Sequence, residues 1–95
     1  IGQNWTMRIW GRDFTPDSEI FRFSNVNGDI VAVEYHTDDI YCWFELKVRH
    51  VDWTWGYVAE SAHIALPSSA EEIFCWVRSV NSLYDIKIEN RGVVS

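Results

Sequence analysis

The chain has 95 residues, 47% of them apolar and 16% aromatic, and 14 Asp and Glu against 8 Lys and Arg give a net charge of −6 with neutral histidines. This length predicts a single domain, 1–95, with a core of its own, and the apolar content excludes a disordered chain. No apolar run approaches the roughly 18 residues of a membrane span, and the acidic balance argues against binding to nucleic-acid phosphates. We expect a soluble globular domain with no nucleic-acid partner and no membrane insertion.

Strand-like patterns fill the first part of the chain. Trp5 to Trp10 alternates in the manner of a first strand, and the Pro, Asp and Ser of residues 13–18 predict a turn. Residues 19–24 and 30–36 also alternate, and Asn27-Gly28 lies between them. Asn-Gly is the strongest short signal for a β-hairpin because both residues tolerate positive φ. The two segments are therefore predicted to pair.

The most regular period in the chain lies between Ile40 and Val48. Apolar residues occupy every second position there, and Tyr41, Trp43, Glu45 and Lys47 lie between them. This is the pattern of a strand with one buried and one solvated face. With a tight turn at residues 37–39 before it, the segment is predicted to be the central strand of the sheet and to complete a three-stranded antiparallel meander with residues 19–24 and 30–36.

Residues 69–82 admit two interpretations. Ser69 and Glu72 have capping-box spacing, and Ile73, Val77 and Val80 fall on one apolar arc when residues are placed 100° apart, which favours an amphipathic helix. A strand over residues 72–78 is the alternative. We favour the helix, and with a last strand over residues 84–89 we predict an α+β fold: an antiparallel sheet of five to six strands with one helix packed on it. The alternative fold is an all-β sandwich.

Two cysteines, Cys42 and Cys75, also leave two possibilities open. One disulfide would close a loop of about 33 residues, and it would form if residues 72–78 were a strand with Cys75 pointing inward. Two buried free thiols in a cytosolic domain are the other possibility. The start at Ile1-Gly2 is typical of a processed chain or of a fragment, so we expect a secreted or extracellular protein.

No stretch carries a catalytic or metal-binding motif. The histidines His36, His50 and His63 match no known ligand or nucleophile spacing with the cysteines, and ordinary surface or packed histidines explain them. Residues 25–29 resemble part of a calcium loop but lack its acidic first position. We expect no catalytic residue, no cofactor and no metal.

The segment from His50 to Tyr57 is the candidate binding site. It combines polar and aromatic residues around Gly56, namely His50, Asp52, Trp53, Trp55 and Tyr57. On an extended backbone the last three side chains would share one face and form a platform. Sugar rings have an apolar C–H face and a rim of hydroxyls, so flat rings with polar groups beside them suit a sugar. The alternative is that these rings belong to the core.

Six Trp, five Phe and four Tyr are more aromatic residues than one sheet and one helix can bury. Exposed aromatic area usually marks a binding site. We therefore predict a ligand surface, and also a homodimer whose interface covers some of the rings. A two-sheet sandwich would be another way to bury them.

In size, low cysteine content, acidic balance and Trp-rich β texture, with HVDWTWGY as the most suggestive stretch, the chain resembles the small fruit-body lectins of mushrooms that bind α-galactosides. The resemblance is one of overall character and assigns no residue. It implies a secreted or stored fungal protein that binds galactose-type sugars, forms a homodimer and has no catalytic activity. The alternatives are a secreted protein-binding inhibitor or effector that uses the same aromatic residues, and, less favoured because of the acidic charge, a small RNase-like hydrolase.

Overall fold

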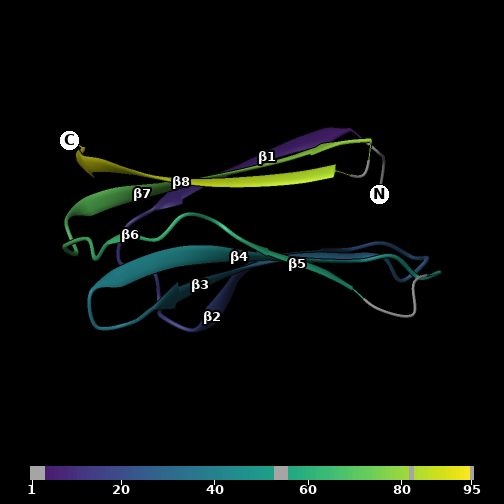
Figure 1. The fold of residues 1–95 in the computed structure, drawn as a ribbon, viewed down its shortest axis with the longest axis horizontal. Helices are drawn as coiled ribbons and strands as arrows, with labels where there is room; N and C mark the ends of the chain where they lie inside the picture. Colours follow the sequence, from purple (N-terminus) through teal and green to yellow (C-terminus); the bar gives the residue numbers. More distant parts are fainter. Residues whose placement is uncertain (1–3, 53–55, 82, 95) are drawn as a thin grey trace.

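A computed structural model describes residues 4–52, 56–81 and 83–94 and shows two antiparallel sheets packed face to face as a β-sandwich (Figure 1). Sheet A has the strand order β1 (Trp5–Gly11), β7 (Glu71–Val80) and β8 (Leu83–Val93). Sheet B has the order β2 (Ser18–Ser24), β3 (Ile30–Thr37), β4 (Tyr41–Arg49) and β5 (Tyr57–Glu60), and the short β6 (Ile64–Ala65) also pairs with β4. None of the described residues forms a helix of the length and hydropathy needed to cross a bilayer.

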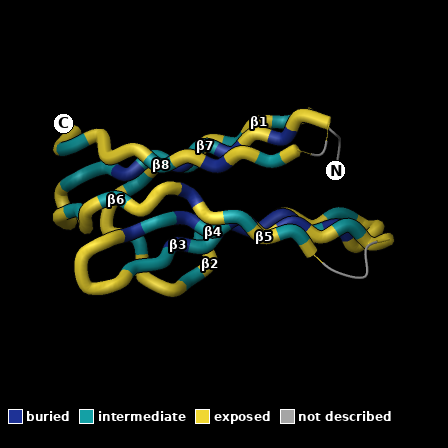
Figure 2. The backbone as a smooth tube through the Cα atoms, viewed as in Figure 1, coloured by how far each residue is buried: buried dark blue, intermediate teal, exposed yellow. Residues whose placement is uncertain are grey.

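The core lies between the two sheets. Buried positions alternate with more exposed ones along the strands (Figure 2), and the fully buried side chains include Phe44 and Leu46 of β4 and Val77 of β7. Phe14, in the connection after β1, packs its ring 5.9 Å from that of Phe44. Burying one such side chain contributes about 1.5–3 kcal/mol. The core uses one face of each sheet, so the two outer faces are left for other purposes.

The predicted meander is confirmed as β2, β3 and β4. The turn spans residues 25–28, where the amide of Gly28 donates a hydrogen bond to the carbonyl oxygen of Asn25 at 3.1 Å, and Gly28 has a φ of +93°. The side chain of Asn25 closes this turn by accepting hydrogen bonds from the amides of Asn27 and Asp29 at 3.0 and 3.1 Å. The predicted central strand is β4, which pairs with β3 on one side and with β5 and β6 on the other. The first and last predicted strands correspond to β1 and β8.

The prediction of a helix over residues 69–82, and with it the α+β fold, is wrong. The segment forms β7, in which Ile73, Cys75 and Val77 are buried while Phe74 and Trp76 lie on the outer face. Because the outer face of this strand also carries aromatic residues, apolar residues occur at both parities and happen to satisfy a helical period. Pairing with β1 and β8 on both sides decides in favour of the strand. The fold is the all-β sandwich that the sequence left as the alternative.

The turn before β7 joins Ser68 and Glu71, one residue earlier than the predicted capping pair Ser69 and Glu72, and a strand follows it. The amide of Ser68 donates a hydrogen bond to the Glu71 carboxylate at 2.8 Å, and the amide of Glu71 donates to the carbonyl oxygen of Ser68 at 3.1 Å. This reciprocal bonding satisfies a short turn as well as it would satisfy the first turn of a helix. A capping-box spacing therefore does not by itself determine which element follows it.

Both cysteines are buried free thiols, so no disulfide links them. Cys42 lies on β4 of sheet B and Cys75 on β7 of sheet A. Burial raises the pKa of both thiols, that of Cys75 to about 12. Since the thiolate is the reactive form, neither sulfur is a nucleophile in the folded protein.

Candidate ligand-binding surface

The platform predicted from the sequence falls partly outside the described residues. This applies to Trp53 and Trp55, so the proposal that they bind a ligand stays a prediction. Asp52 is exposed in the turn that follows β4. Of the five predicted residues, the structure brings two together, His50 and Tyr57.

His50 and Tyr57 meet at Tyr84, which belongs to the opposite sheet. The Nε2 atom of His50 lies 3.2 Å from the Tyr84 hydroxyl, and the ring centroids of Tyr57 and Tyr84 are 5.0 Å apart. His50 also approaches Asp29, with 3.7 Å between Nδ1 and Oδ1. The side chains of His50 and Tyr57 are half-buried. His50 and Tyr57 therefore help to join the two sheets at this end of the sandwich and do not form a flat exposed surface.

A different set of rings lies on the outer face of sheet A. In the strand register, Trp10 of β1 is directly opposite Phe74 of β7, and Arg8 is opposite Trp76. Side chains at alternate positions of a strand share a face, so all four project away from the core. We call Trp10, Phe74 and Trp76 the aromatic face.

The aromatic face is open to solvent. Trp10 is 60% exposed, and Phe74 and Trp76 are half-buried. A shallow groove of about 250 Å³ runs beside two of these rings and is lined by Phe74, Trp76, Lys87, Ile88 and Glu89. Pockets that enclose a drug-sized ligand start at about 300 Å³. This groove is therefore suited to a ligand that lies across the sheet.

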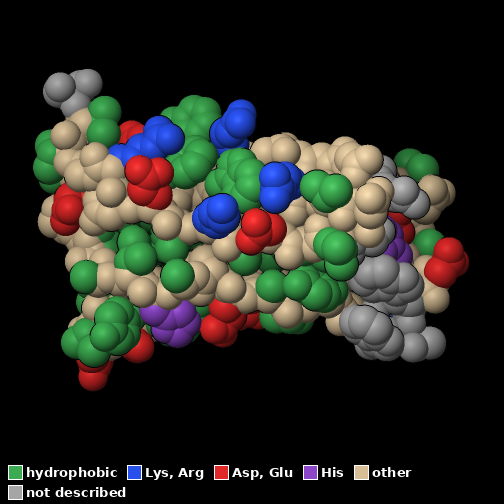
Figure 3. Space-filling view, turned by 45° about the horizontal axis from the view of Figure 1, so that its top comes forward, with side chains coloured by type: hydrophobic (Ala, Val, Ile, Leu, Met, Phe, Trp, Pro, Cys, Tyr) green, Lys and Arg blue, Asp and Glu red, His purple; other side chains and the backbone are tan. Residues whose placement is uncertain are grey.

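Cationic side chains surround the rings. The Arg78 guanidinium and the Lys87 ammonium lie 5.0 and 5.1 Å from the Trp76 ring centroid, and the Arg91 guanidinium lies 4.1 Å from that of Phe74. These are cation–π distances, which hold the rings in place. Figure 3 shows Lys and Arg side chains interspersed with hydrophobic ones on this side of the molecule.

Acidic groups balance these cations. Asp85 lies 3.9 Å from Arg78, and Glu72 lies 3.9 Å from Arg91. Strands β1, β7 and β8 together carry four Lys and Arg and four Asp and Glu, so they have no net charge. The remaining four cations and ten acids give the rest of the chain its −6. The aromatic face is thus a neutral region of an acidic protein.

Sequence reasoning missed the aromatic face because its residues come from segments 64 positions apart, Trp10 and Phe74. A signal was present in the alternation of Phe74, Trp76 and Arg78, which places all three on one side of a strand. The helix prediction instead placed Phe74 and Trp76 on the arc that faces the core and Arg78 on the opposite arc. Among the residues that the structure describes, one group of histidine and carboxylate side chains is close enough together to hold a metal ion, and it lies on sheet B: Glu34, His36 and Glu45.

The aromatic face can stack against a ligand and form hydrogen bonds with it. The rings offer flat apolar area, while Arg8 and Lys87 supply donors and Asp85 and Glu89 supply acceptors. Such a surface suits a molecule with an apolar face and a polar rim. Comparison of the chain with models of protein families, with curated proteins and with solved structures finds no match.

Proposed function

We propose that the protein is a carbohydrate-binding protein, a lectin without catalytic activity, and that sugar lies on the aromatic face. The observation that carries this proposal is the 60% exposed Trp10 of β1, which lies opposite Phe74 on the neighbouring strand β7, with Trp76 two residues further along β7. A pyranose ring can stack its C–H face on such rings while its hydroxyls reach the charged side chains around them. Contiguous exposed apolar area of this kind usually marks a binding site.

The charge balance supports a neutral sugar. The four acids on the strands of sheet A equal the four cations, and two of the cations, Arg78 and Arg91, each approach a carboxylate. A strongly acidic glycan would need an excess of cations. Galactose-type sugars are the first candidates, because of the resemblance to the mushroom lectins.

A second candidate is the protein-binding factor. Val80 and Leu83 continue the aromatic face as a directly paired aliphatic patch, and they are 43% and 76% exposed. Aromatic residues flanked by aliphatic ones are typical of interface hot spots. A second copy of the chain is one possible partner of this patch, and sedimentation at micromolar concentration would detect the homodimer.

A glycan array tests the proposal directly. The array would compare the wild type with Trp10→Ala and Trp76→Ala, and with Tyr41→Ala as a matched control, since Tyr41 is a 41% exposed aromatic residue on sheet B. Truncating a ring that carries binding energy costs more than about 1 kcal/mol, which corresponds to a loss of affinity of about fivefold or more. We expect this loss in the two Trp variants and none in Tyr41→Ala, with all three melting like the wild type.

Two further variants, Trp53→Ala and Trp55→Ala, distinguish the aromatic face from the platform predicted from the sequence. If these lose sugar binding while Trp10→Ala and Trp76→Ala keep it, the ligand lies beside His50 and Tyr57 and the assignment to sheet A is wrong. If the wild type binds no glycan on the array, the lectin proposal itself fails and the protein-binding factor takes its place.

A further inference from the structure

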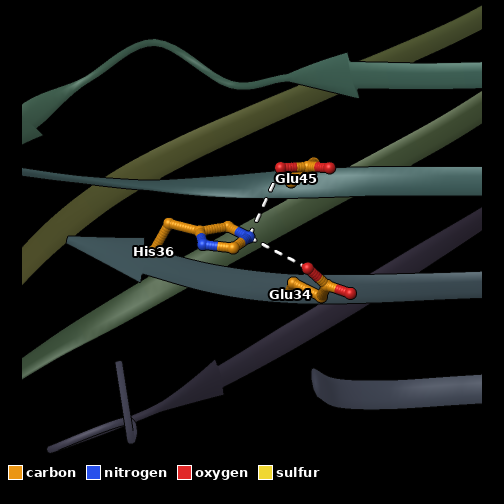
Figure 4. A group of neighbouring side chains, drawn as sticks. All are labelled: Glu34, His36 and Glu45. Carbon is orange, nitrogen blue, oxygen red and sulfur yellow. Dashed lines mark hydrogen bonds and ion pairs between the residues drawn. The ribbon is translucent and has the colours of Figure 1, made fainter. Parts of the chain in front are cut away.

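Two glutamates face each other across the outer surface of sheet B. Glu34 of β3 is directly opposite Glu45 of β4 in the antiparallel register, and His36 is two residues further along β3 on the same face (Figure 4). Like charges directly opposite each other destabilise a sheet. A positive group between them would remove this cost.

The Nε2 atom of His36 points between the two carboxylates. It lies 3.0 Å from Glu34 Oε1 and 3.3 Å from Glu45 Oε2, as the dashed lines in Figure 4 mark. The other ring nitrogen, Nδ1, lies 2.9 Å from Asp17 Oδ1. When the Nδ1 proton is donated to Asp17 and Nε2 carries none, the Nε2 lone pair faces two anionic oxygens, and a metal ion can take the place that a proton on Nε2 would otherwise hold. A carboxylate that accepts the second N–H is the usual outer partner of a metal-bound histidine.

The spacing of the three atoms fits one small ion. The ligand atoms of Glu34, His36 and Glu45 all lie within 4.8 Å of one another. Zn²⁺ binds nitrogen and oxygen at about 2.0–2.2 Å in a tetrahedral arrangement, which separates neighbouring ligand atoms by roughly 3.4 Å. The observed 3.0 and 3.3 Å are close to that separation. The three side chains are each about one-fifth exposed, at 21%, 21% and 19%, so solvent can reach the site.

Charge also matches a divalent ion. Asp17, Glu34 and Glu45 carry three negative charges, and Lys47 supplies one positive charge through its ammonium, 2.9 Å from Glu34 Oε2 and 3.9 Å from Glu45 Oε1. Lys47 approaches the carboxylate oxygens that His36 does not approach, so it leaves the pair that faces Nε2 available. With a neutral imidazole the four charged groups sum to −2, which one divalent cation neutralises.

The ring of His36 is held in place by its neighbours. Trp43 lies directly opposite it on β4, with ring centroids 6.0 Å apart and an angle of 21° between the planes. The other neighbour of Trp43 is His63, stacked at 4.0 Å and 9°. A site whose ligands come from two paired strands and whose histidine is oriented on both ring nitrogens is pre-organised.

We propose that Glu34, His36 and Glu45 bind one divalent transition-metal ion of the Zn²⁺ class, with Asp17 as the outer partner of His36. Mixed imidazole and carboxylate ligands suit such ions. Three protein ligands leave a fourth position for water or for an oxygen of a bound molecule. The site shares no residue with the aromatic face, so it can exist whether or not the protein binds sugar.

Two metal titrations of chelator-treated protein test the site. Binding of Zn²⁺ is measured by calorimetry, and binding of Co²⁺ by its visible absorption. We expect one ion per chain and a rise in melting temperature on adding Zn²⁺. His36→Gln and Glu45→Gln should lose most of the affinity, and Asp17→Asn should lose about 10- to 100-fold. The matched control is His63→Gln, because His63 is the other histidine of the Trp43 stack and is not a ligand. It should bind like the wild type.

Each other outcome counts against the site. Wild-type protein that takes up no Zn²⁺ at millimolar concentration overturns the proposal, as does full binding by a folded His36→Gln. If His36→Gln fails to fold, Glu45→Gln decides, because it removes one charge of the facing pair with little change of shape. Loss of binding in His63→Gln with binding retained in Glu45→Gln would place the ion elsewhere.

Discussion

The two outer faces of the sandwich differ although they cover the same core. The face of sheet A is electrically balanced and carries three rings with their cations, whereas the face of sheet B carries a histidine between two glutamates. In both sheets alternate residues point to the core, which leaves the residues between them free to vary. A domain of this size can therefore carry two unrelated surfaces, and changes on one should leave the other intact.

The largest expected effect is that of Val77→Asp, which should unfold the domain and so remove both outer faces. Val77 is fully buried on β7, between Trp76 and Arg78, which point outward. Val77→Asp buries a charge with no counter-ion and should cost more than about 4 kcal/mol, enough to unfold the domain and abolish both binding activities. Chemical denaturation measures it. The control, Arg78→Gln on the adjacent outward position, should stay within about 1 kcal/mol of the wild type. A folded Val77→Asp would show that the inner face of β7 is not core.

A smaller effect should sharpen the contrast on sheet B. The hydrogen bond from Lys47 is the main reason that the pKa of Glu34 is lowered. Lys47→Met removes the one ammonium beside the facing glutamates, so metal-free protein should lose up to about 1 kcal/mol of stability, as for a partly exposed ion pair. The same change makes the site more negative, so Zn²⁺ affinity should rise.

Lys87→Met is the control for that variant, because Lys87 stands over Trp76 on the other sheet. It should leave Zn²⁺ affinity unchanged. An unchanged Zn²⁺ affinity in Lys47→Met would mean that the ammonium does not act on the site, and the charge argument for a divalent ion would lose its basis.

The smallest expected effect is the response to salt. Raising the ionic strength from about 0.1 M to 1 M shortens the screening length from about 10 Å to about 3 Å. With a salt whose anion does not bind Zn²⁺, metal affinity should fall a few-fold, while binding of a neutral sugar should stay constant because the strands of sheet A have no net charge. Parallel calorimetric titrations compare the two. Sugar binding that weakens as strongly as metal binding would contradict a neutral ligand.

Much of sheet B could be predicted because β4 has a buried residue at every second position, from Cys42 to Val48. The Asn27-Gly28 turn and the period of β4 are local signals, and they produced the right meander. β7 failed because Phe74 and Trp76 lie on its outer face, where they obscure the two-residue period. What excludes the helix is the hairpin with β8, in which Val80 is paired with Leu83, together with the pairing with β1, a long-range fact that local patterns do not contain.

The two candidate sites differ in how far local signals could predict them. The turn at residues 37–39 could have been used to infer that Glu34 lies opposite Glu45, because the register of a hairpin follows from its turn. Without that step the histidine remained an isolated residue. The aromatic face had no such short-range clue, since Trp10 and Phe74 meet only when the first strand pairs with the seventh.

The two cysteines make it possible to follow how the sandwich opens. Each sheet holds one buried thiol, Cys42 on β4 and Cys75 on β7, and a thiol reagent reaches a buried sulfur only through transient opening. Labelling at equal rates would mean that both sheets come apart in one cooperative event. Faster labelling of Cys75 would mean that the three-stranded layer detaches first and leaves the meander intact, which would make the molecule two folding units of unequal stability.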